Sequence, residues 1–301
     1  MADGDYERGR GREIGAIAAE LKRLAAVREG LNGRDARCPS AEGARLPPSV
    51  FVLNGWAASP RAWDLCRFTR MHLFGYVEQL DGGPEKSIES VERCILVGWP
   101  MGGSSALRLA ARWPEKIAGL VLIAATPRMM EDKATGWKGM SPRRLEALRY
   151  GLVMTRGEGF FGVPEGKPNP YLTDEPANLE RGLKYLLETD VRADLERVFA
   201  DGGLKQQSGQ QAYNNKMCAN GAMPVNKTCA SRLSPPVYIF HSEHDGIVRA
   251  TNADYLQKVF PQASVTMVPG TEHALPIFIP ELIDEAVDSC LRLAAAGQDI
   301  A

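Results

Sequence analysis

The stretch LVGWPMGG, residues 96–103, decides the fold. An apolar run ends there at a glycine, and two more glycines follow before a segment with helical spacing. The arrangement matches the pattern G-x-S-x-G, in which a serine lies on a sharp turn from a strand into a helix. Gly98 and Gly102 supply the glycines of this pattern, but Pro100 occupies the serine position. The stretch therefore predicts a strand, a tight turn (the elbow) and a helix, without the hydroxyl group that the turn usually carries.

Three other apolar runs end in loops that contain polar residues. They are residues 50–53 before Asn54-Gly55-Trp56, residues 236–240 before a loop with Asp245, and residues 264–268 before a loop with His273. Short apolar runs that end near Gly or Pro indicate buried strands. The order of elbow, acid and histidine along the chain is that of the nucleophile, aspartate and histidine in α/β hydrolases.

These segments together resemble the α/β-hydrolase superfamily, and within it the pimeloyl-acyl-carrier-protein methyl ester esterases of biotin synthesis. The resemblance covers about residues 48 to 290. It implies an α/β fold with a mostly parallel central sheet, helices on both faces and a helical lid insertion. It also implies a carboxylic ester hydrolase that needs no cofactor. The implied substrate is a small ester or an acyl thioester on a carrier, and the implied partner is acyl carrier protein.

The resemblance also assigns roles to individual residues. His273 would act as base and then acid, and Asp245 would orient its imidazole ring. The backbone amides of Trp56 and Met101 would form the oxyanion hole. Asn54 replaces the usual histidine of the oxyanion loop, which is a mild change because backbone amides do the work there. The two antiparallel strands that normally open the fold are not evident before residue 48.

Pro100 is the serious departure from the family pattern. Proline has no hydroxyl, so no acyl-enzyme can form at this position. It also fixes φ near −65°, whereas the elbow residue of active members holds a strained positive φ. We therefore expect a reshaped turn, a displaced Met101 amide and a loss of about a million-fold in rate. The sequence predicts an impaired esterase, and the alternative is a catalytically silent hydrolase-fold protein that binds an acyl ligand or a protein partner.

Other groups could replace the missing nucleophile. Ser104 and Ser105 follow the elbow, Cys94 lies in the preceding strand, and a water molecule could be activated by His273. The simpler interpretation is structural: the serines satisfy free amides of the first helical turn, and the cysteine is a small buried apolar residue. Structural roles are also expected of the remaining histidines, His72, His241 and His244.

The chain divides into three predicted parts. Residues 1–47 form a helical extension and linker, residues 48–126 and 235–301 form the hydrolase core, and residues 127–234 form a helical lid. Helices are expected over residues 142–154, 178–187 and 192–199. Four lid arginines could contact an acidic carrier protein, although a solvated helix face neutralised by acids such as Glu146 is the simpler interpretation. They are Arg143, Arg144, Arg149 and Arg156.

Composition excludes several classes of protein. A net charge of −1 over 301 residues gives no general attraction to nucleic acid or to an anionic membrane. No apolar run approaches the ~18 residues of a membrane span, and the charged first residues lack the apolar core of a signal peptide. The six cysteines contain no C-x-x-C pair, and no His/Cys/Asp spacing suggests a metal site. A cytoplasmic protein with reduced thiols is expected.

Overall fold

The computed structural model describes residues 47–68, 71–154, 167, 169–172, 175–199, 235–270 and 272–296. Several predictions fall outside these residues. They concern the N-terminal helix of residues 14–27, the lid residue Arg156, and the thiols of Cys38, Cys218 and Cys229.

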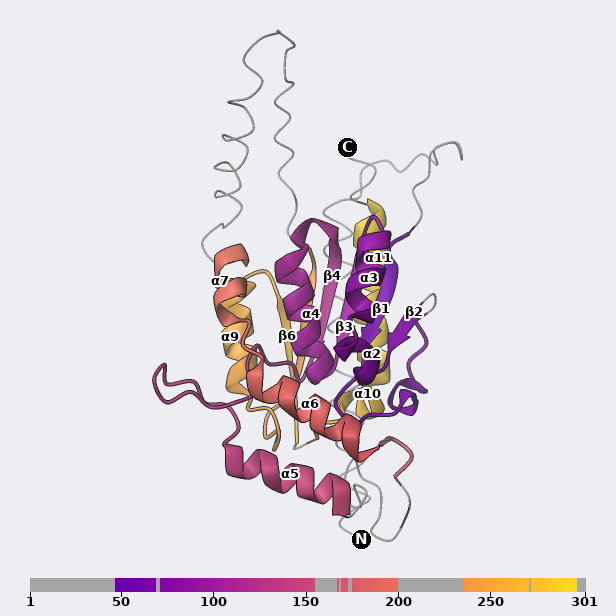
Figure 1. Cartoon of the computed structure of the whole chain (residues 1–301). Helices are drawn as coiled ribbons and strands as arrows, with labels where there is room; N and C mark the ends of the chain where they lie inside the picture. Colours follow the sequence, from indigo (N-terminus) through magenta and orange to yellow (C-terminus); the bar gives the residue numbers. More distant parts are fainter. Residues whose placement is uncertain are drawn as a thin grey trace, which may run out of the picture.

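A six-stranded sheet forms the centre of the described structure (Figure 1). The strands are β1 (Ser49–Leu53), β2 (Met71–Phe74), β3 (Cys94–Gly98), β4 (Ile117–Ile123), β5 (Val237–Ser242) and β6 (Ser264–Val268). Their order across the sheet is β2-β1-β3-β4-β5-β6, and every neighbouring pair is parallel. The expected α/β-hydrolase sheet is therefore confirmed, with all described strands parallel.

Helices cover both faces of the sheet, as expected. The described helices are α2 (Tyr76–Leu80), α3 (Gly83–Ser90), α4 (Met101–Arg112), α5 (Pro142–Met154), α6 (Pro176–Glu188), α7 (Arg192–Phe199), α9 (Thr251–Val259), α10 (Leu275–Phe278) and α11 (Pro280–Ala296). Helices α3, α4, α7 and α9 pack on one face, and α10 and α11 pack on the other. None of the helices in the described part of the chain is both long and apolar enough to cross a membrane.

The alternation of side chains along each strand divides the core into two layers. In β1, Val50 and Val52 point to the layer of α11, whereas Phe51 and Leu53 point to the layer of α4. All four side chains are buried, which is typical of a parallel strand covered on both faces. The apolar runs of the sequence have no polar face for this reason.

The carboxyl ends of the strands lie along one edge of the sheet. Leu53 at the end of β1 is paired with Gly98 at the end of β3, and Gly98 is paired with Leu122 of β4. Parallel strands place the loops that follow them on the same side, and ligands of open α/β sheets bind there. The loops after β1, β3, β5 and β6 are therefore brought together, although they are far apart in the sequence.

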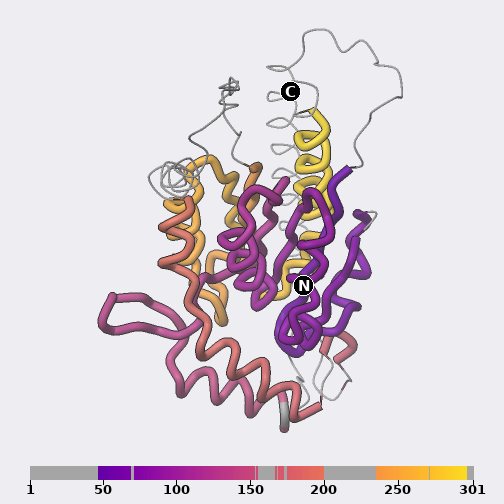
Figure 2. Tube along the Cα trace, turned by 45° about the horizontal axis from the view of Figure 1, so that its top comes forward, coloured from indigo at the N-terminus to yellow at the C-terminus, as the bar shows by residue number. Residues whose placement is uncertain are grey.

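Helices α5 and α6 lie side by side across this end of the sheet (Figures 1 and 2). The predicted helices over residues 142–154 and 192–199 are confirmed with the same bounds, and α6 begins two residues earlier than expected. Between β4 and α5, Asp132 and Trp137 exchange two backbone hydrogen bonds of 3.0 and 2.9 Å. They form a small antiparallel loop that the sequence did not predict. The division of the chain into lid and core stays a prediction.

Candidate active site

The elbow joins β3 to α4 through Trp99 and Pro100. Pro100 has φ −72° and ψ −36°, and α4 begins at the next residue. The amide of Ser104 donates to the Pro100 carbonyl over 3.2 Å, as in an ordinary helical turn. The predicted strand, turn and helix are present, and Pro100 has right-handed helical backbone with φ in the range that proline allows. The elbow stores no backbone strain at this residue.

The glycines of the elbow are required by the packing of strand against helix. A Cβ atom on Gly102 would collide with the carbonyl oxygen of Leu53, and one on Gly98 would collide with the backbone of Gly102. The Trp99 amide donates to the same Leu53 carbonyl over 3.1 Å. The elbow is therefore pressed against the end of β1, and only glycine fits at these two positions.

Asn54 organises the loop after β1. Its side-chain amide donates to the Ala58 carbonyl over 2.8 Å. Its Oδ1 accepts from the Gly55 amide and from the Trp63 ring nitrogen, each over 3.0 Å. The loop also holds Ala57 at φ +59°, a left-handed conformation that strains a residue with a Cβ atom. The sequence predicts only a mild replacement at Asn54, although asparagine before glycine is a known turn former.

Trp56 fastens this loop to α6. Its ring nitrogen donates to the Leu179 carbonyl over 3.1 Å. A Cβ atom on Gly182 would collide with the Trp56 ring, so the glycine makes room for the indole. The segment expected to carry one oxyanion amide is thus tied to the predicted lid.

Asp245 and His273 meet at the ends of β5 and β6. His273 Nδ1 lies 2.7 Å from Asp245 Oδ2, and the Asp245 side chain is fully buried. The other carboxylate oxygen accepts from the amides of Ile247 (2.7 Å) and Val248 (2.9 Å). Burial raises the pKa of Asp245, but the charge of His273, its hydrogen bond and the two amides outweigh burial and hold the pKa below its usual value. An ionised Asp245 therefore fixes the proton of His273 on Nδ1 and leaves Nε2 as the reactive atom.

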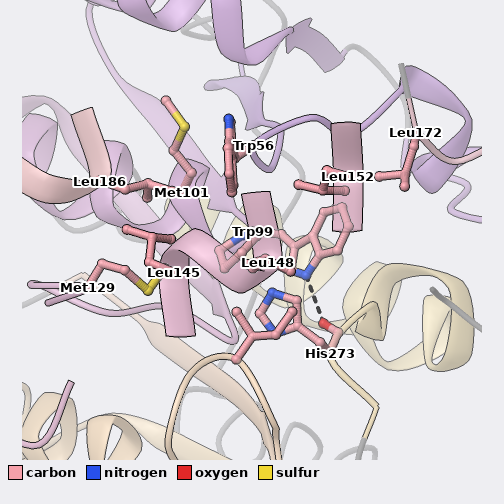
Figure 3. A pocket seen from close by; sticks show the side chains of 12 residues that line it. Trp56, Trp99, Met101, Met129, Leu145, Leu148, Leu152, Leu172, Leu186 and His273 are labelled. Carbon is pink, nitrogen blue, oxygen red and sulfur yellow. Dashed lines mark hydrogen bonds between the residues drawn. The ribbon is translucent and has the colours of Figure 1, made fainter. Parts of the chain in front are cut away.

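A second contact joins the histidine loop to the elbow. The Trp99 ring nitrogen donates to the His273 carbonyl over 2.8 Å, as the dashed line in Figure 3 shows. The two rings lie with their centres 6.0 Å apart. Trp99 thus fixes the distance between the elbow and the histidine, a role that its place in the motif did not reveal.

An apolar pocket opens above the elbow and the histidine (Figure 3). The pocket is open to solvent at its mouth. Its lining consists of Trp56, Trp99, Pro100, Met101, Met129, Leu145, Leu148, Leu152, Leu172, Leu186, Ile247 and His273. Three of the leucines come from α5 and one from α6, so both helices form its walls. His273 is the one titratable side chain among these residues.

The structure brings together five predicted site residues, Trp56, Pro100, Met101, Asp245 and His273. The serines after the elbow lie elsewhere. Ser104 is buried and its hydroxyl donates to the Thr126 carbonyl over 2.6 Å rather than accepting from a free amide. Ser105 lies 3.2 Å from the Tyr185 hydroxyl, and neither serine lines the pocket.

Cys94 begins β3, at the opposite end of the strand from the elbow. It is fully buried, and burial raises the pKa of its thiol to about 12. A thiol in this state is a small apolar residue, as expected. Within the described ranges, no group of three His, Cys, Asp or Glu side chains gathers as a metal site would.

The predicted lid arginines differ in their surroundings. Arg149 binds Glu146 through both carboxylate oxygens and also contacts Glu180 over 2.8 Å. The expected neutralisation by Glu146 is therefore confirmed for this arginine. Arg143 and Arg144 are exposed at the start of α5. The guanidinium group of Arg144 lies beside Gly246, the residue after Asp245.

A parallel α/β sheet with an elbow after β3, an acid after β5 and a histidine after β6 defines the class of protein. A family model described as the alpha/beta hydrolase fold matches residues 55–279. The chain belongs to this family. Among solved structures it is similar to a hydrolase from Oleispira antarctica, with a TM-score of 0.56, 12% identity and coverage of 86% of this chain and 99% of that one. This likeness shows the fold.

Two relatives have names that specify a particular esterase rather than a fold. The chain is 25% identical over 280 residues to the pimeloyl-[acyl-carrier protein] methyl ester esterase of Nitrosomonas europaea, covering 80% of this chain and 95% of that protein. It is 22% identical over 287 residues to the esterase of the same name from Nitrosospira multiformis, covering 82% and 94%. The chain is therefore similar over nearly the full length of these esterases.

Proposed function

We propose that the protein is a carboxylic ester hydrolase of the pimeloyl-acyl-carrier-protein methyl ester esterase type, impaired at Pro100. The observation that carries the proposal is the hydrogen-bonded pair of Asp245 and His273 beside an apolar pocket that also contains the elbow. With Nδ1 held by Asp245, Nε2 of His273 is left to accept a proton in the pocket. The site lacks the hydroxyl group at position 100 that would donate this proton.

The chemistry of the complete site follows from this geometry. In a Pro100→Ser variant, the hydroxyl would lose its proton to His273 and its oxygen would attack the ester carbonyl carbon. The amides of Trp56 and Met101 would stabilise the negative oxygen that develops. His273 would then return the proton to the leaving alcohol. A water molecule would release the acid by the same steps, and Asp245 would stabilise the charged imidazole throughout.

The pocket walls favour an apolar acyl group. Leu145, Leu148 and Leu152 project from α5 toward the elbow, and Leu186 of α6 closes another side (Figure 3). Each methylene group of an acyl chain that is buried against such walls contributes ~0.8 kcal/mol to the free energy of binding. We assign α5 and α6 to the predicted lid, and we propose that this lid admits the acyl chain.

The test is hydrolysis of p-nitrophenyl butyrate by the protein with Pro100 and by two elbow variants. Pro100→Ser supplies the hydroxyl, and Pro100→Ala relaxes the backbone without supplying it. We expect a gain of about a thousandfold or more for the serine variant alone, because losing a serine nucleophile typically costs about a million-fold. The gain should disappear when His273→Ala is added.

A folded Pro100→Ser variant without activity would contradict the assignment of the catalytic residues. Equal gains in the serine and alanine variants would show that the backbone, rather than a nucleophile, had limited the reaction. His273-dependent activity of the protein as written would mean that a water molecule attacks the ester directly.

A second function is favoured by the state of the pocket, which stays open and apolar although the nucleophile is absent. In this alternative the protein binds an acyl ligand without hydrolysing it. Trp56 and Trp99 line the pocket, so binding of the monomethyl ester of pimelic acid should change the tryptophan fluorescence and saturate. The change should weaken in a Leu148→Gln variant. A chain that shows no saturable change at millimolar ligand is not such a binder.

The exposed arginines at the start of α5 are the proposed contact with acyl carrier protein. Arg143 and Arg144 directly precede the pocket residue Leu145 in α5, whereas Arg149 is engaged by Glu146 and Glu180. Replacing Arg143 and Arg144 by Glu should weaken carrier binding at low salt, and Lys184→Glu on the exposed side of α6 serves as the control. Equal binding by both variants would favour a solvated helix face.

A further inference from the structure

Two consecutive residues at the end of β5 contact the loops that carry both members of the Asp245–His273 pair. His241 and Ser242 are fully buried, and neither is part of the pocket lining. Successive side chains of a strand point to opposite faces of the sheet. One strand end can therefore reach two loops, one on each side.

His241 contacts the loop of the acid. Its Nε2 lies 2.9 Å from the Val248 carbonyl oxygen. The amide of the same residue, Val248, donates to Asp245 Oδ1 over 2.9 Å. A single peptide residue thus connects the histidine ring with the carboxylate, and the position of Val248 sets the position of Asp245.

The hydrogen bond fixes the protonation state of His241. A carbonyl can only accept, so Nε2 must carry the proton, and Nδ1 has no partner in the described part of the chain. Burial lowers the pKa of His241, although the Val248 carbonyl and Asp245 favour its charged form. His273 opposes that charge and Asp254 favours it. The ring is a neutral donor in this arrangement.

Ser242 contacts the loop of the histidine. Its hydroxyl donates to the carbonyl of Glu272, the residue before His273. Two backbone bonds of 3.0 Å continue the contact, from Glu243 to Val268 and from His244 to Gly270. The start of the acid loop and the histidine loop are therefore joined directly, and of these three contacts the one made by the serine hydroxyl is closest in sequence to His273.

We propose that His241 and Ser242 are positioning residues that hold Asp245 and His273 in hydrogen-bonding geometry. This inference rests on the proposed function, because it assigns the pair a catalytic use. A bond of 2.7 Å between two loops requires both to be placed within about 0.5 Å. The two contacts from one strand supply that placement without touching a substrate.

The first test measures the pair itself and needs no esterase activity. Nuclear magnetic resonance of the imidazole of His273 in the protein as written reports its Nδ1 proton and tautomer. We expect His241→Leu and Ser242→Ala to shift or broaden this proton signal. His241→Gln should keep it, because the side-chain amide of glutamine can donate to the Val248 carbonyl from a similar reach. His244→Gln, at an exposed neighbouring position, is the control.

The second test measures kcat and KM in the Pro100→Ser background. We expect His241→Leu and Ser242→Ala to lower kcat by about a hundredfold, the effect of a misplacement of about 1 Å, with KM nearly unchanged. His241→Gln should restore most of kcat. A merely structural role would lower the amount of folded enzyme and leave the kcat of the folded fraction unchanged.

The two tests separate the inference from the proposed function. An inert Pro100→Ser enzyme would refute the proposed function. The resonance of His273 would still decide whether His241 and Ser242 hold Asp245 and His273 in place. A folded Ser242→Ala variant that keeps an unaltered resonance and kcat would overturn the role of Ser242. If His241→Leu does not fold, His241→Asn, whose amide is too short to reach Val248, takes its place, and an unaltered resonance there would overturn the role of His241.

Discussion

The other parts of the site around Pro100 are held in place by contacts that do not involve the proline. The glycines of the elbow are fixed by contact with Leu53, and the pair of Asp245 and His273 is fixed by its own loops. Gly55 of the neighbouring loop approaches the Pro100 ring so closely that a Cβ atom there would lie 2.9 Å from it. The proline is thus packed into the site rather than tolerated at its surface, and a serine would leave space beside Gly55.

Gly102 offers the sharpest test of the elbow. A Gly102→Ala substitution places a methyl group against the Leu53 carbonyl, and backbone cannot move aside as a flexible side chain can. We expect the free energy of unfolding to fall by about 3 kcal/mol or more, measured by urea denaturation. The control is Gly75→Ala, where no atom lies within 4 Å of the new methyl group. Equal stability of the two variants would mean that the strand and helix are less tightly packed.

The sequence predicted the residues whose identity follows from a motif. Gly98, Gly102, Asp245 and His273 occupy the expected places, because each type follows an apolar run at a fixed spacing. The partners of polar side chains could not be predicted in the same way. The Thr126 carbonyl that accepts from Ser104 is more than twenty residues away, and only the folded chain brings the two together.

The small loop between β4 and α5 is pinned by a charged network. Arg192 at the start of α7 binds Asp132 over 3.0 Å and Asp190 over 2.8 Å, and its guanidinium group lies over the Trp137 ring. Arg128 also binds Asp190, over 2.6 Å. The hydrogen bond from Arg192, supported by Arg128 against the effect of burial, lowers the pKa of Asp190 to about 2. The loop is thereby fastened to α7.

We expect this network to contribute to stability more than the other ion pairs of the same helix. Arg192→Met should lower the free energy of unfolding by about 2 kcal/mol, because two carboxylates lose a charged hydrogen bond. Arg197→Met on α7 removes an exposed pair with Asp194 and should change it by less than about 0.5 kcal/mol. Thermal unfolding of both variants provides the comparison. A larger loss for Arg197→Met would contradict the assigned role of the network.

Periodicity predicted α5 and α7 because both repeat apolar residues at helical spacing. The loop around Asp132 and Trp137 was missed, since two short backbone contacts leave no repeating pattern in the sequence. The role of α6 in holding Trp56 was also beyond reach, because it depends on Gly182 facing an indole ring from a distant loop.

The stability of the whole molecule should depend on pH through its buried titratable groups. The pKa of His241 is lowered by burial from its usual 6.5, and the pKa of Asp245 lies below its usual 3.8. In both cases the unfolded chain binds protons more readily than the folded one. Each group therefore contributes stability that is complete above its usual pKa and is lost as the pH falls through its folded value.

The melting temperature should accordingly decline in two steps on acidification, one beginning below pH 6.5 and one below pH 3.8. A His241→Gln variant should lack the first step, because glutamine does not titrate. His244→Gln should keep both. A first step that survives in His241→Gln would show that another group causes it.

The fold as a whole was the easiest level to predict, because each buried parallel strand appears as a short apolar run that ends in a glycine- or proline-containing loop. The order of the strands across the sheet could not be predicted from the runs themselves. The two-layered burial of β1 shows why: Val50, Phe51, Val52 and Leu53 are equally apolar, and nothing in them identifies a neighbour.

The pairing of β4 with β5 has a consequence for the synthesis of the chain. The two strands are neighbours in the sheet, yet Val237 emerges from the ribosome more than a hundred residues after Ile123. Closing a loop of that length costs about 4 kcal/mol of chain entropy, which must be met by the pairing itself. A nascent chain that ends before Val237 has β1 to β4 but leaves one edge of β4 uncovered. This edge presents unpaired backbone N–H and C=O groups, through which the unfinished protein would pair with copies of itself unless a chaperone bound it.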